Sequence, residues 1–317
     1  MKSQLLKFSI VSPVYLAETV ITELVSEIYM AMENLGSYEI ILVEDSSPDN
    51  SWKIIEQLSK KYSSIKAIKL SRNFGQHAAI TAGLNYAKGE WVIVMDCDLQ
   101  DKPSEIPRLY SKAKEGFDIV QAKRTIRYDG FFKKTFSRFF YKLFEILSGV
   151  GQDHTIANFG IYNKKVIKAF NTFNEPLRSF PSIINWIGYS KTSIEVAHGI
   201  NSDDRKTSYS VKKLIRLALS IIVSYSNKPL HISIIIGVVV SMIGFMFGSF
   251  YVVRYAFLGN SVSGFTTLIS SIWFLSGIIL IMMGILGIYL SSIFDTVKSR
   301  PLFLVDEELG FLDNMVQ

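Results

Sequence analysis

Two aspartates that follow an apolar stretch are the side chains in this sequence best suited to chemistry. Residues 91–95 read as a buried strand, and Asp96 and Asp98 come directly after it, with a third acid at Asp101. Side chains alternate in direction along an extended chain, so Asp96 and Asp98 can point the same way. Two converging carboxylates repel each other unless they surround a cation or share a proton. The spacing therefore indicates a candidate ligand site, and a solvated turn is the alternative.

Oxygen ligands of this kind suit a hard divalent cation. Asp98, together with Asp96 and Gln100, would offer carboxylate and amide oxygens to Mg²⁺ or Mn²⁺. Such an ion keeps positions open for phosphate oxygens, and it neutralises the charge of a diphosphate that leaves. The pattern therefore favours chemistry on a phosphorylated substrate.

The elements that must position these aspartates alternate between strand and helix patterns. Such an alternation predicts a doubly wound α/β fold around a mostly parallel sheet, with ligands bound beyond the carboxyl ends of the strands. We expect strands at residues 8–13, 38–43, 67–70, 91–95 and 118–122, and helices at residues 18–35, 50–61, 76–88 and 103–115.

Four of the loops after these strands are polar and meet on the same rim of the expected sheet. They contain residues 13–15, Glu44 and Asp45, Arg72 and Asn73, and the aspartates described above. Asp45 could accept hydrogen bonds from a base or a ribose, and Arg72 could pair with a phosphate, although a solvated loop is the alternative for Arg72. The glycine signatures of dinucleotide and P-loop sites are absent from the sequence. The rim therefore predicts a nucleotide pocket of another kind.

Composition adds broad limits. A chain of 317 residues has room for about two domains. The single cysteine, Cys97, cannot form an internal disulfide, which suits a reducing compartment. The polar start of the sequence predicts no cleavable signal peptide. The formal net charge of +6 favours an anionic partner, such as a phosphate, a nucleotide or a membrane surface.

The second half of the chain carries membrane signals. Residues 131–147 form a basic amphipathic pattern rich in phenylalanine, which indicates either a membrane surface or a helix packed on its own domain. A second basic amphipathic segment covers residues 208–230. Residues 232–258 contain one charge and residues 265–294 contain none, and each stretch exceeds the ~20 residues needed to cross a bilayer.

The two apolar stretches predict a transmembrane hairpin. Basic residues precede the first stretch and follow the second, so the positive-inside rule places the large N-terminal domain and the tail in the cytoplasm. Glycines in both stretches offer close packing within the hairpin or between subunits of a homo-oligomer. The expected organisation is a catalytic domain at 1–207, a juxtamembrane segment at 208–230, the hairpin at 231–294 and a cytoplasmic tail at 295–317.

Several motifs in order along the chain resemble those of family 2 glycosyltransferases with the GT-A fold. The resemblance is closest to the group that acts on polyprenyl phosphates, such as bactoprenol glucosyltransferases and dolichol-phosphate mannose synthases. It rests on residues 12–15 (Ser-Pro-Val-Tyr), 42–49 (Leu-Val-Glu-Asp-Ser-Ser-Pro-Asp), 71–75 (Ser-Arg-Asn-Phe-Gly), 95–101 (Met-Asp-Cys-Asp-Leu-Gln-Asp), 208–214 and 287–303.

The resemblance implies a Rossmann-like GT-A domain that moves a sugar, with inversion, from a nucleotide sugar to a polyprenyl phosphate. The donor is commonly a UDP-sugar, the lipid would be undecaprenyl phosphate, and the setting would be a bacterial plasma membrane; no nucleic-acid partner is implied. The implied donor-site residues are Pro13, Tyr15, Glu18, Asp45, Arg72, Asp96 and Asp98, of which Asp98 is catalytic; the implied metal ligands are Asp96, Asp98 and Gln100; the implied acceptor-phosphate residues are Arg124, Arg138 and Arg205.

Two departures from the family pattern concern the acceptor side. One is in the basic motif before Ser208, where Asp203 and Asp204 stand ahead of Arg205 and Lys206. The other is at residues 158–160. Many bactoprenol glucosyltransferases have Asp-Phe-Arg where this chain has Asn158-Phe-Gly160. Asn158, at a catalytic position, cannot accept a proton as a carboxylate does, and Gly160 lacks the cation. Two alternatives stay open. One is transfer to a saccharide hydroxyl, against which the missing carboxylate argues because a hydroxyl needs a base. The other is a membrane nucleotide-sugar-binding subunit without catalysis, which Asn158 and Gly160 support.

Overall fold

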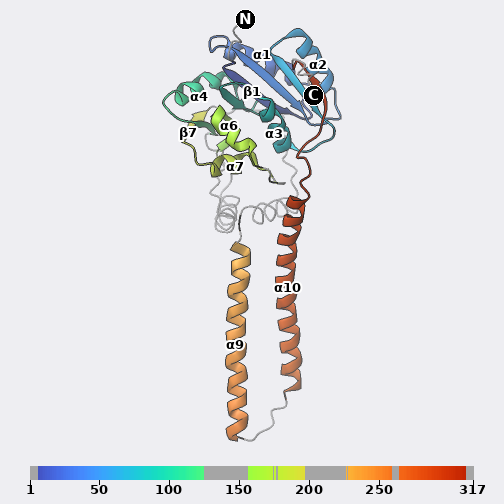
Figure 1. Ribbon diagram of the computed structural model, residues 1–317, viewed down its shortest axis with the longest axis vertical. Coiled ribbons are helices and arrows are strands. Elements are labelled where there is room, and N and C mark those ends of the chain that lie inside the picture. Colours follow the sequence, from blue (N-terminus) through green and yellow to red (C-terminus); the bar gives the residue numbers. More distant parts are fainter. Residues whose placement is uncertain are drawn as a thin grey trace, which may run out of the picture. The chain divides into compact units, whose positions relative to one another are not determined.

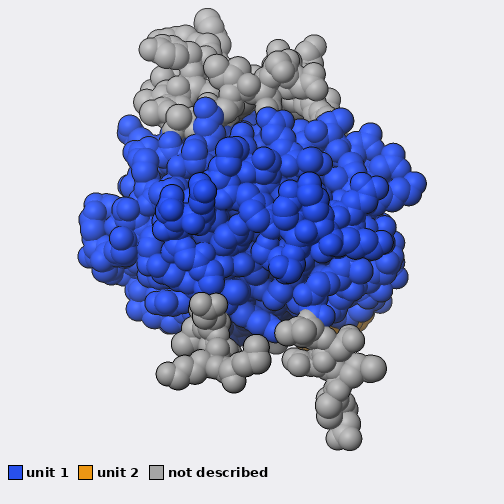
Figure 2. Space-filling model, turned by 90° about the horizontal axis from the view of Figure 1, so that it is seen from above, with its two compact units in different colours: residues 1–129, 152–208, 300–317 blue, residues 130–151, 209–299 orange. Residues whose placement is uncertain are grey.

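The structure is a computed structural model that describes residues 6–124, 156–173, 175, 178–196, 226, 228–258 and 264–311. The chain divides into two compact units, coloured in Figure 2. The first comprises residues 1–129, 152–208 and 300–317, and the second comprises residues 130–151 and 209–299. Each unit is described by itself.

The first unit is an α/β domain around one eight-stranded sheet in the described residues (Figure 1). The strand order is β7-β5-β6-β4-β1-β2-β3-β8. The strands are β1 (Phe8–Val14), β2 (Tyr38–Glu44), β3 (Ile65–Leu70), β4 (Trp91–Val94), β5 (Ile119–Arg124), β6 (Ile156–Asn163), β7 (Lys191–Val196) and β8 (Val305–Leu309). The helices are α1 (Ile21–Met32), α2 (Ser51–Lys61), α3 (Gln76–Tyr86), the 3₁₀ turn η1 (Pro103–Glu105), α4 (Ile106–Ala113), α6 (Lys164–Asn171) and α7 (Phe180–Trp186).

Two hydrophobic clusters cover the two faces of this sheet. Side chains of β1 alternate between them, so that Phe8, Ile10 and Val14 join one cluster and Val11 joins the other. Helices α1, α2 and α4 supply the first cluster, and α3, α6 and α7 supply the second. The predicted doubly wound α/β arrangement is confirmed, including all five predicted strands.

The sheet differs from the prediction by three additional strands. β6 lies between β4 and β5 and runs antiparallel to both, β7 pairs parallel with β5, and β8 pairs antiparallel with β3. Their sequences give weak strand signals, because β6 has asparagine and glycine at its centre and β8 has three consecutive acids. The tail, expected to be a segment outside the domain, thus contributes an edge strand to the sheet.

The second unit contains two long apolar helices, α9 (Lys228–Leu258) and α10 (Phe265–Val297). Within them, Lys228–Phe250 and Ser271–Val297 are long and apolar enough to cross a membrane, and these stretches are not buried against other described parts of the chain. Both helices agree with the predicted spans. The predicted amphipathic helix at 131–147 and most of the segment 208–230 lie outside the described residues.

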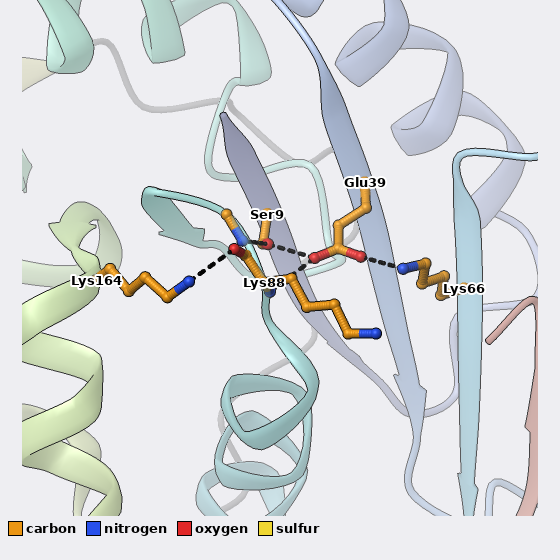
Figure 3. A network of polar contacts seen from close by, with 6 residues as sticks. Ser9, Glu39, Lys66, Lys88 and Lys164 are labelled. Atoms are coloured by element: carbon orange, nitrogen blue, oxygen red, sulfur yellow. Dashed lines mark hydrogen bonds and ion pairs between the residues drawn. The ribbon is translucent and has the colours of Figure 1, made fainter. Parts of the chain in front are cut away.

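A buried carboxylate connects several strands near the amino end of β2, at the opposite end of that strand from the polar rim. Figure 3 shows its contacts. Glu39, on β2, accepts hydrogen bonds from Ser9 Oγ at 2.6 Å and from the Lys88 backbone N–H at 2.9 Å, and it pairs with Lys66 on β3. Ser9 Oγ in turn accepts the Gly89 N–H at 2.8 Å. One side chain therefore connects β1, β2, β3 and the turn that leads into β4.

We predict that Glu39→Ala destabilises the first unit by about 3 kcal/mol, because three donors lose a charged acceptor in a buried position. Urea unfolding of the full-length protein, followed by tryptophan fluorescence, measures this. Glu23→Ala, which removes an exposed carboxylate from α1, is the control and should change stability by less than ~0.5 kcal/mol. Equal stability of the two variants would contradict the role given to Glu39.

Candidate active site

The carboxyl ends of four strands bring the predicted donor-site residues to one rim. β1 pairs parallel with both β2 and β4, and β2 pairs parallel with β3. Tyr15, Asp45, Arg72 and Asp96 follow these strands on the same side of the sheet. Pro13 differs from the prediction in detail, because it lies within β1 and is buried.

Asp45 is the buried anchor of this rim, with 3% of its surface exposed. Its carboxylate accepts two backbone hydrogen bonds, from Phe74 N–H at 2.7 Å and from Gly75 N–H at 2.8 Å. Burial raises the pKa of Asp45, and the two N–H donors partly offset this by favouring the charged form. Gly75 has a φ of +93°, which favours glycine, where the chain turns into α3. The predicted nucleotide-contacting residue thus also holds the loop between β3 and α3.

The same loop reaches the aspartates after β4. Gln76, the first residue of α3, donates a hydrogen bond through Nε2 to Asp96 Oδ1 at 2.6 Å. The guanidinium of Arg72 lies 4.6 Å from the centre of the Phe74 ring, so Arg72 is exposed but oriented. Gln76 was not among the predicted site residues, because a glutamine at the start of a helix has no signal that reveals a partner twenty positions away.

Asp101, the last acid of the turn after β4, stabilises this turn by a hydrogen bond. Asp101 is buried, and its Oδ2 accepts the Asp96 backbone N–H at 3.3 Å, while Asp98 Oδ1 accepts the Gln100 N–H at 3.1 Å. Leu99 adopts a φ of +60°, a left-handed conformation that L residues seldom take. Asp101 therefore shapes the turn, while Asp98 is exposed and Asp96 is half-buried.

The residues of this turn fit a divalent cation held jointly with a substrate. Among the described residues, no cluster of three or more His, Cys, Asp or Glu side chains has the arrangement of a metal site. Mg²⁺, however, is commonly held by one or two carboxylates together with substrate phosphates and water. Asp96, Asp98 and Gln100 offer hard oxygen donors of this kind, and the exposure of Asp98 leaves its carboxylate accessible.

Cys97 lies between these aspartates and packs partly against the core. Burial, with a smaller contribution from the charges of Asp96 and Asp98, raises the pKa of its thiol to about 11. The raised pKa keeps the thiol protonated at neutral pH, so it gives no sign of an activated thiolate.

A second group of contacts joins the loops after β1 and β2. Asp49 accepts hydrogen bonds from Ser47 Oγ at 2.7 Å and from Glu18 N–H at 3.1 Å, and Glu18 Oε2 accepts the Asn50 N–H at 2.9 Å. Burial alone would raise the pKa of Asp49, but its hydrogen bonds outweigh this and lower the pKa to about 2. Glu18, predicted to contact the donor, thus also joins the loop that contains Tyr15 to the loop after Asp45.

The antiparallel strand β6 brings the predicted acceptor side to the same rim. Val94 on β4 is paired with Gly160 on β6 at the end of this ladder, and Asp96 and Asn158 each lie two residues beyond this pair, toward the rim. A Cβ at Gly160 would lie 2.9 Å from Val120 O and 2.9 Å from Tyr162 Oη. A side chain at this position would therefore have to displace the Val120 carbonyl or the Tyr162 hydroxyl, so the packing favours glycine here.

Tyr162 fills the space beside Gly160. It is fully buried, and its hydroxyl donates to Asn158 O at 3.4 Å. Burial and the charge of Asp101 raise the pKa of Tyr162, and a hydrogen bond with Gln121 partly offsets this. The phenol consequently stays neutral and supports Asn158 through the backbone.

The predicted acceptor-phosphate arginines are only partly covered by the structure. Arg124 is the last residue of β5, on the same side of the sheet as the donor residues, and nothing is described of its side chain. Arg138 and Arg205 lie outside the described residues. Their roles stay predictions.

The sheet is mostly parallel, and carboxylates lie at the carboxyl ends of its central strands. In α/β proteins this is where ligands bind. The model of glycosyl transferase family 2 matches residues 9–171, which include every rim residue described above. The chain belongs to this family and is a glycosyltransferase.

Its relatives are similar over nearly their whole length. An uncharacterized glycosyltransferase, YkcC of Bacillus subtilis (strain 168), is 33% identical over 97% of this chain and 96% of its own. The undecaprenyl-phosphate 4-deoxy-4-formamido-L-arabinose transferase of Proteus mirabilis (strain HI4320) is 32% identical over 96% of this chain and 94% of its own. Among solved structures, Mycobacterium tuberculosis glucosyl-3-phosphoglycerate synthase aligns with a TM-score of 0.49 and 14% identity, over 69% of this chain and 76% of that one.

We predict that Cys97 reacts slowly with iodoacetamide at pH 8, on the order of 100-fold more slowly than a free cysteine, because so little of a thiol with a pKa of about 11 is ionised. The rate should rise about tenfold for each pH unit until pH approaches 11. Mass spectrometry of the alkylated protein measures the rate, and the urea-unfolded protein is the control. A rate that levels off by pH 9 would contradict the shifted pKa.

We predict that Gly160→Arg destabilises the first unit by about 1–3 kcal/mol, because its Cβ meets the Val120 carbonyl and the Tyr162 hydroxyl. Thermal unfolding of the purified protein detects this loss. Gly160→Ala adds the Cβ alone and should show a smaller loss in the same direction. An arginine variant as stable as the parent protein would show that the crowding at residue 160 is easily relieved.

Proposed function

We propose that the protein is an inverting glycosyltransferase that moves a sugar from a nucleotide sugar, a UDP-sugar by family resemblance, to a polyprenyl phosphate such as undecaprenyl phosphate. The product would be a sugar-lipid for glycosylation of the cell surface.

The observation that carries the proposal is similarity over almost the full chain to relatives named for this acceptor. Undecaprenyl-phosphate 4-deoxy-4-formamido-L-arabinose transferases of three bacteria are 32–33% identical over 94–96% of the chain. The aligned length takes in both the polar rim and most of the apolar helices. An acceptor that is itself a membrane lipid gives a reason for the two parts to share one chain.

On the donor side, Asp45 and the loop that it holds would bind the nucleotide, with Pro13, Tyr15 and Glu18 along the neighbouring loop. Arg72 is exposed beside Phe74 and would pair with the diphosphate. Asp96, Asp98 and Gln100 would hold Mg²⁺ or Mn²⁺. When bound, such a cation neutralises the diphosphate leaving group.

On the acceptor side, Arg124, Arg138 and Arg205 would bind the lipid phosphate. A phosphate oxygen attacks the anomeric carbon in line with the departing diphosphate: the new carbon–oxygen bond forms, the bond to the diphosphate breaks, and the nucleoside diphosphate leaves with the electron pair. A phosphate monoester with a second pKa near 6 is already dianionic at neutral pH. No residue has to take a proton from it, which agrees with asparagine at residue 158.

In a bacterium, the catalytic unit would lie on the cytoplasmic side of the plasma membrane. In the sequence, basic residues precede the first apolar helix and follow the second, including Lys298 and Arg300 after α10. Nucleotide sugars are made in that compartment, so the donor would meet the lipid there.

The proposal is tested with the full-length protein in lipid nanodiscs that contain undecaprenyl phosphate. A panel of radiolabelled nucleotide sugars is supplied with Mg²⁺ or Mn²⁺, and sugar incorporated into lipid is counted. Polyprenol and oligosaccharide acceptors form the parallel arms. Incorporation only into the polyprenyl-phosphate sample supports the proposal, incorporation into a hydroxyl acceptor favours the alternative enzyme, and none with any acceptor favours a binding subunit.

We predict that Asp98→Ala lowers the rate of sugar-lipid formation by about 100-fold or more, because a charged ligand of the diphosphate-bound cation is lost. Glu115→Ala removes an exposed carboxylate at the end of α4 and should leave the rate unchanged. An Asp98→Ala variant that retains most of the activity would contradict the proposed role of this carboxylate as a metal ligand.

A further inference from the structure

The C-terminal strand β8 lies beside the donor loop. It pairs antiparallel with β3, with Ala67 opposite Leu309 and Lys69 opposite Glu307, and the register shifts between Lys69 and Leu70. β3 leads directly into the Ser71–Gly75 loop, whose last two N–H groups Asp45 binds. An element from the far end of the sequence therefore borders the start of the predicted nucleotide site.

Direct contacts extend past the paired strands into the loop itself. The Ser71 N–H donates to the Leu304 carbonyl at 2.9 Å. Phe303 and Val305 pack against the same hydrophobic cluster as Phe74, the residue whose N–H binds Asp45. The two ends of the Ser71–Gly75 loop are thus held from two directions, by Leu304 at the first residue and by Asp45 at the last two.

Charged and aromatic contacts fix the register of β8. Lys69 pairs with Glu307 at 2.5 Å and with Asp306 at 3.4 Å, and the Tyr86 hydroxyl on α3 donates to Glu308. Such partly exposed pairs contribute little energy one by one. Together they favour one alignment, in which Asp306 and Glu307 share Lys69 on β3 and Glu308 accepts from Tyr86 on α3.

Gly310 lets the chain after β8 come close to the start of β3. Its φ is +77°, and a Cβ there would lie 2.7 Å from the Ile65 carbonyl. Both the left-handed conformation and the lack of space exclude other residues without a shift of the chain. Phe311, the next residue, packs on Tyr86 with ring centroids 4.8 Å apart.

We propose that β8 is a positioning element of the donor site, which holds the Ser71–Gly75 loop in the conformation that binds the nucleotide sugar. Residues 298–304 alone separate α10 from β8 in the sequence, so the segment that follows the second apolar helix becomes part of the donor-binding framework. The inference rests on the proposed function for its substrate, but the coupling between β8 and the loop does not.

Without β8, β3 would become an exposed edge strand and Ser71 would lose its partner. The loop would then sample other conformations, and the binding-competent fraction would fall. The apparent affinity for the donor falls in proportion to that fraction, whereas the chemistry of bound donor at Asp98 is untouched. Loss of β8 should therefore raise the donor KM and leave kcat nearly unchanged.

The test uses Gly310→Ala in the full-length protein, with Gly116→Ala as the matched control. Gly116 also has a positive φ, +105°, but a Cβ there meets nothing within 4 Å and it lies in the turn before β5. We expect Gly310→Ala to raise the donor KM roughly tenfold, and to speed amide hydrogen exchange at residues 305–309 and 71–75 together. Gly116→Ala should change neither.

A second variant, Glu307→Lys, places a cation opposite Lys69 without altering the backbone, and Glu115→Lys is its control. It should reproduce both effects if Gly310→Ala proves too unstable to purify. Faster exchange in β8 with unchanged exchange at residues 71–75 would overturn the inference, as would an unchanged donor KM with an undocked β8. A parent protein that makes no sugar-lipid would overturn the proposed function instead, and the exchange data would still decide the coupling.

Discussion

The buried carboxylate of Asp45 is the constraint on which the loops after β2, β3 and β4 depend. A carboxylate so enclosed is stable as an anion only if hydrogen bonds replace its water, and here the N–H groups of Phe74 and Gly75 do so. Those bonds fix where α3 begins, and the position of α3 lets Gln76 reach Asp96. One buried charge thereby sets the relative positions of the ends of β2, β3 and β4.

The central part of this arrangement could be predicted from the sequence because it is locally encoded. β1 to β4 are apolar stretches that end in polar residues, and parallel strands joined by helices must place those ends on one side of the sheet. The position of residues 45, 72, 96 and 98 at one rim of the sheet follows from that rule. The alternation of β1 between two hydrophobic clusters follows from the period of two in an extended chain.

The remainder could not be predicted, because it depends on partners that are distant in the sequence. Strand β6 contains asparagine and glycine, and only its place between β4 and β5 makes it a strand. The sequence of β8, with its consecutive acids, is typical of a solvated tail. Only the contacts of these acids with Lys69 and Tyr86 explain why it forms a strand. Likewise, the sequence at Gly160 indicates only that a positive charge is missing. The structure shows that the Tyr162 hydroxyl and the Val120 carbonyl already fill the space beside this residue.

Under the proposed function, the strand order divides the rim into a donor side and an acceptor side. The predicted donor-side residues follow β4, β1, β2 and β3, whereas Arg124 ends β5 and Asn158 lies near the start of β6, on the other side of β4. The boundary is the β4–β6 pair, which ends at Val94 and Gly160, two residues before Asp96 on one strand and two residues from Asn158 on the other. Under the proposed function, a sugar held by its diphosphate at Asp96 and Asp98 and a phosphate approaching from β5 would meet near this boundary. The antiparallel strand inserted into the parallel sheet would then bring the two substrates to the same place.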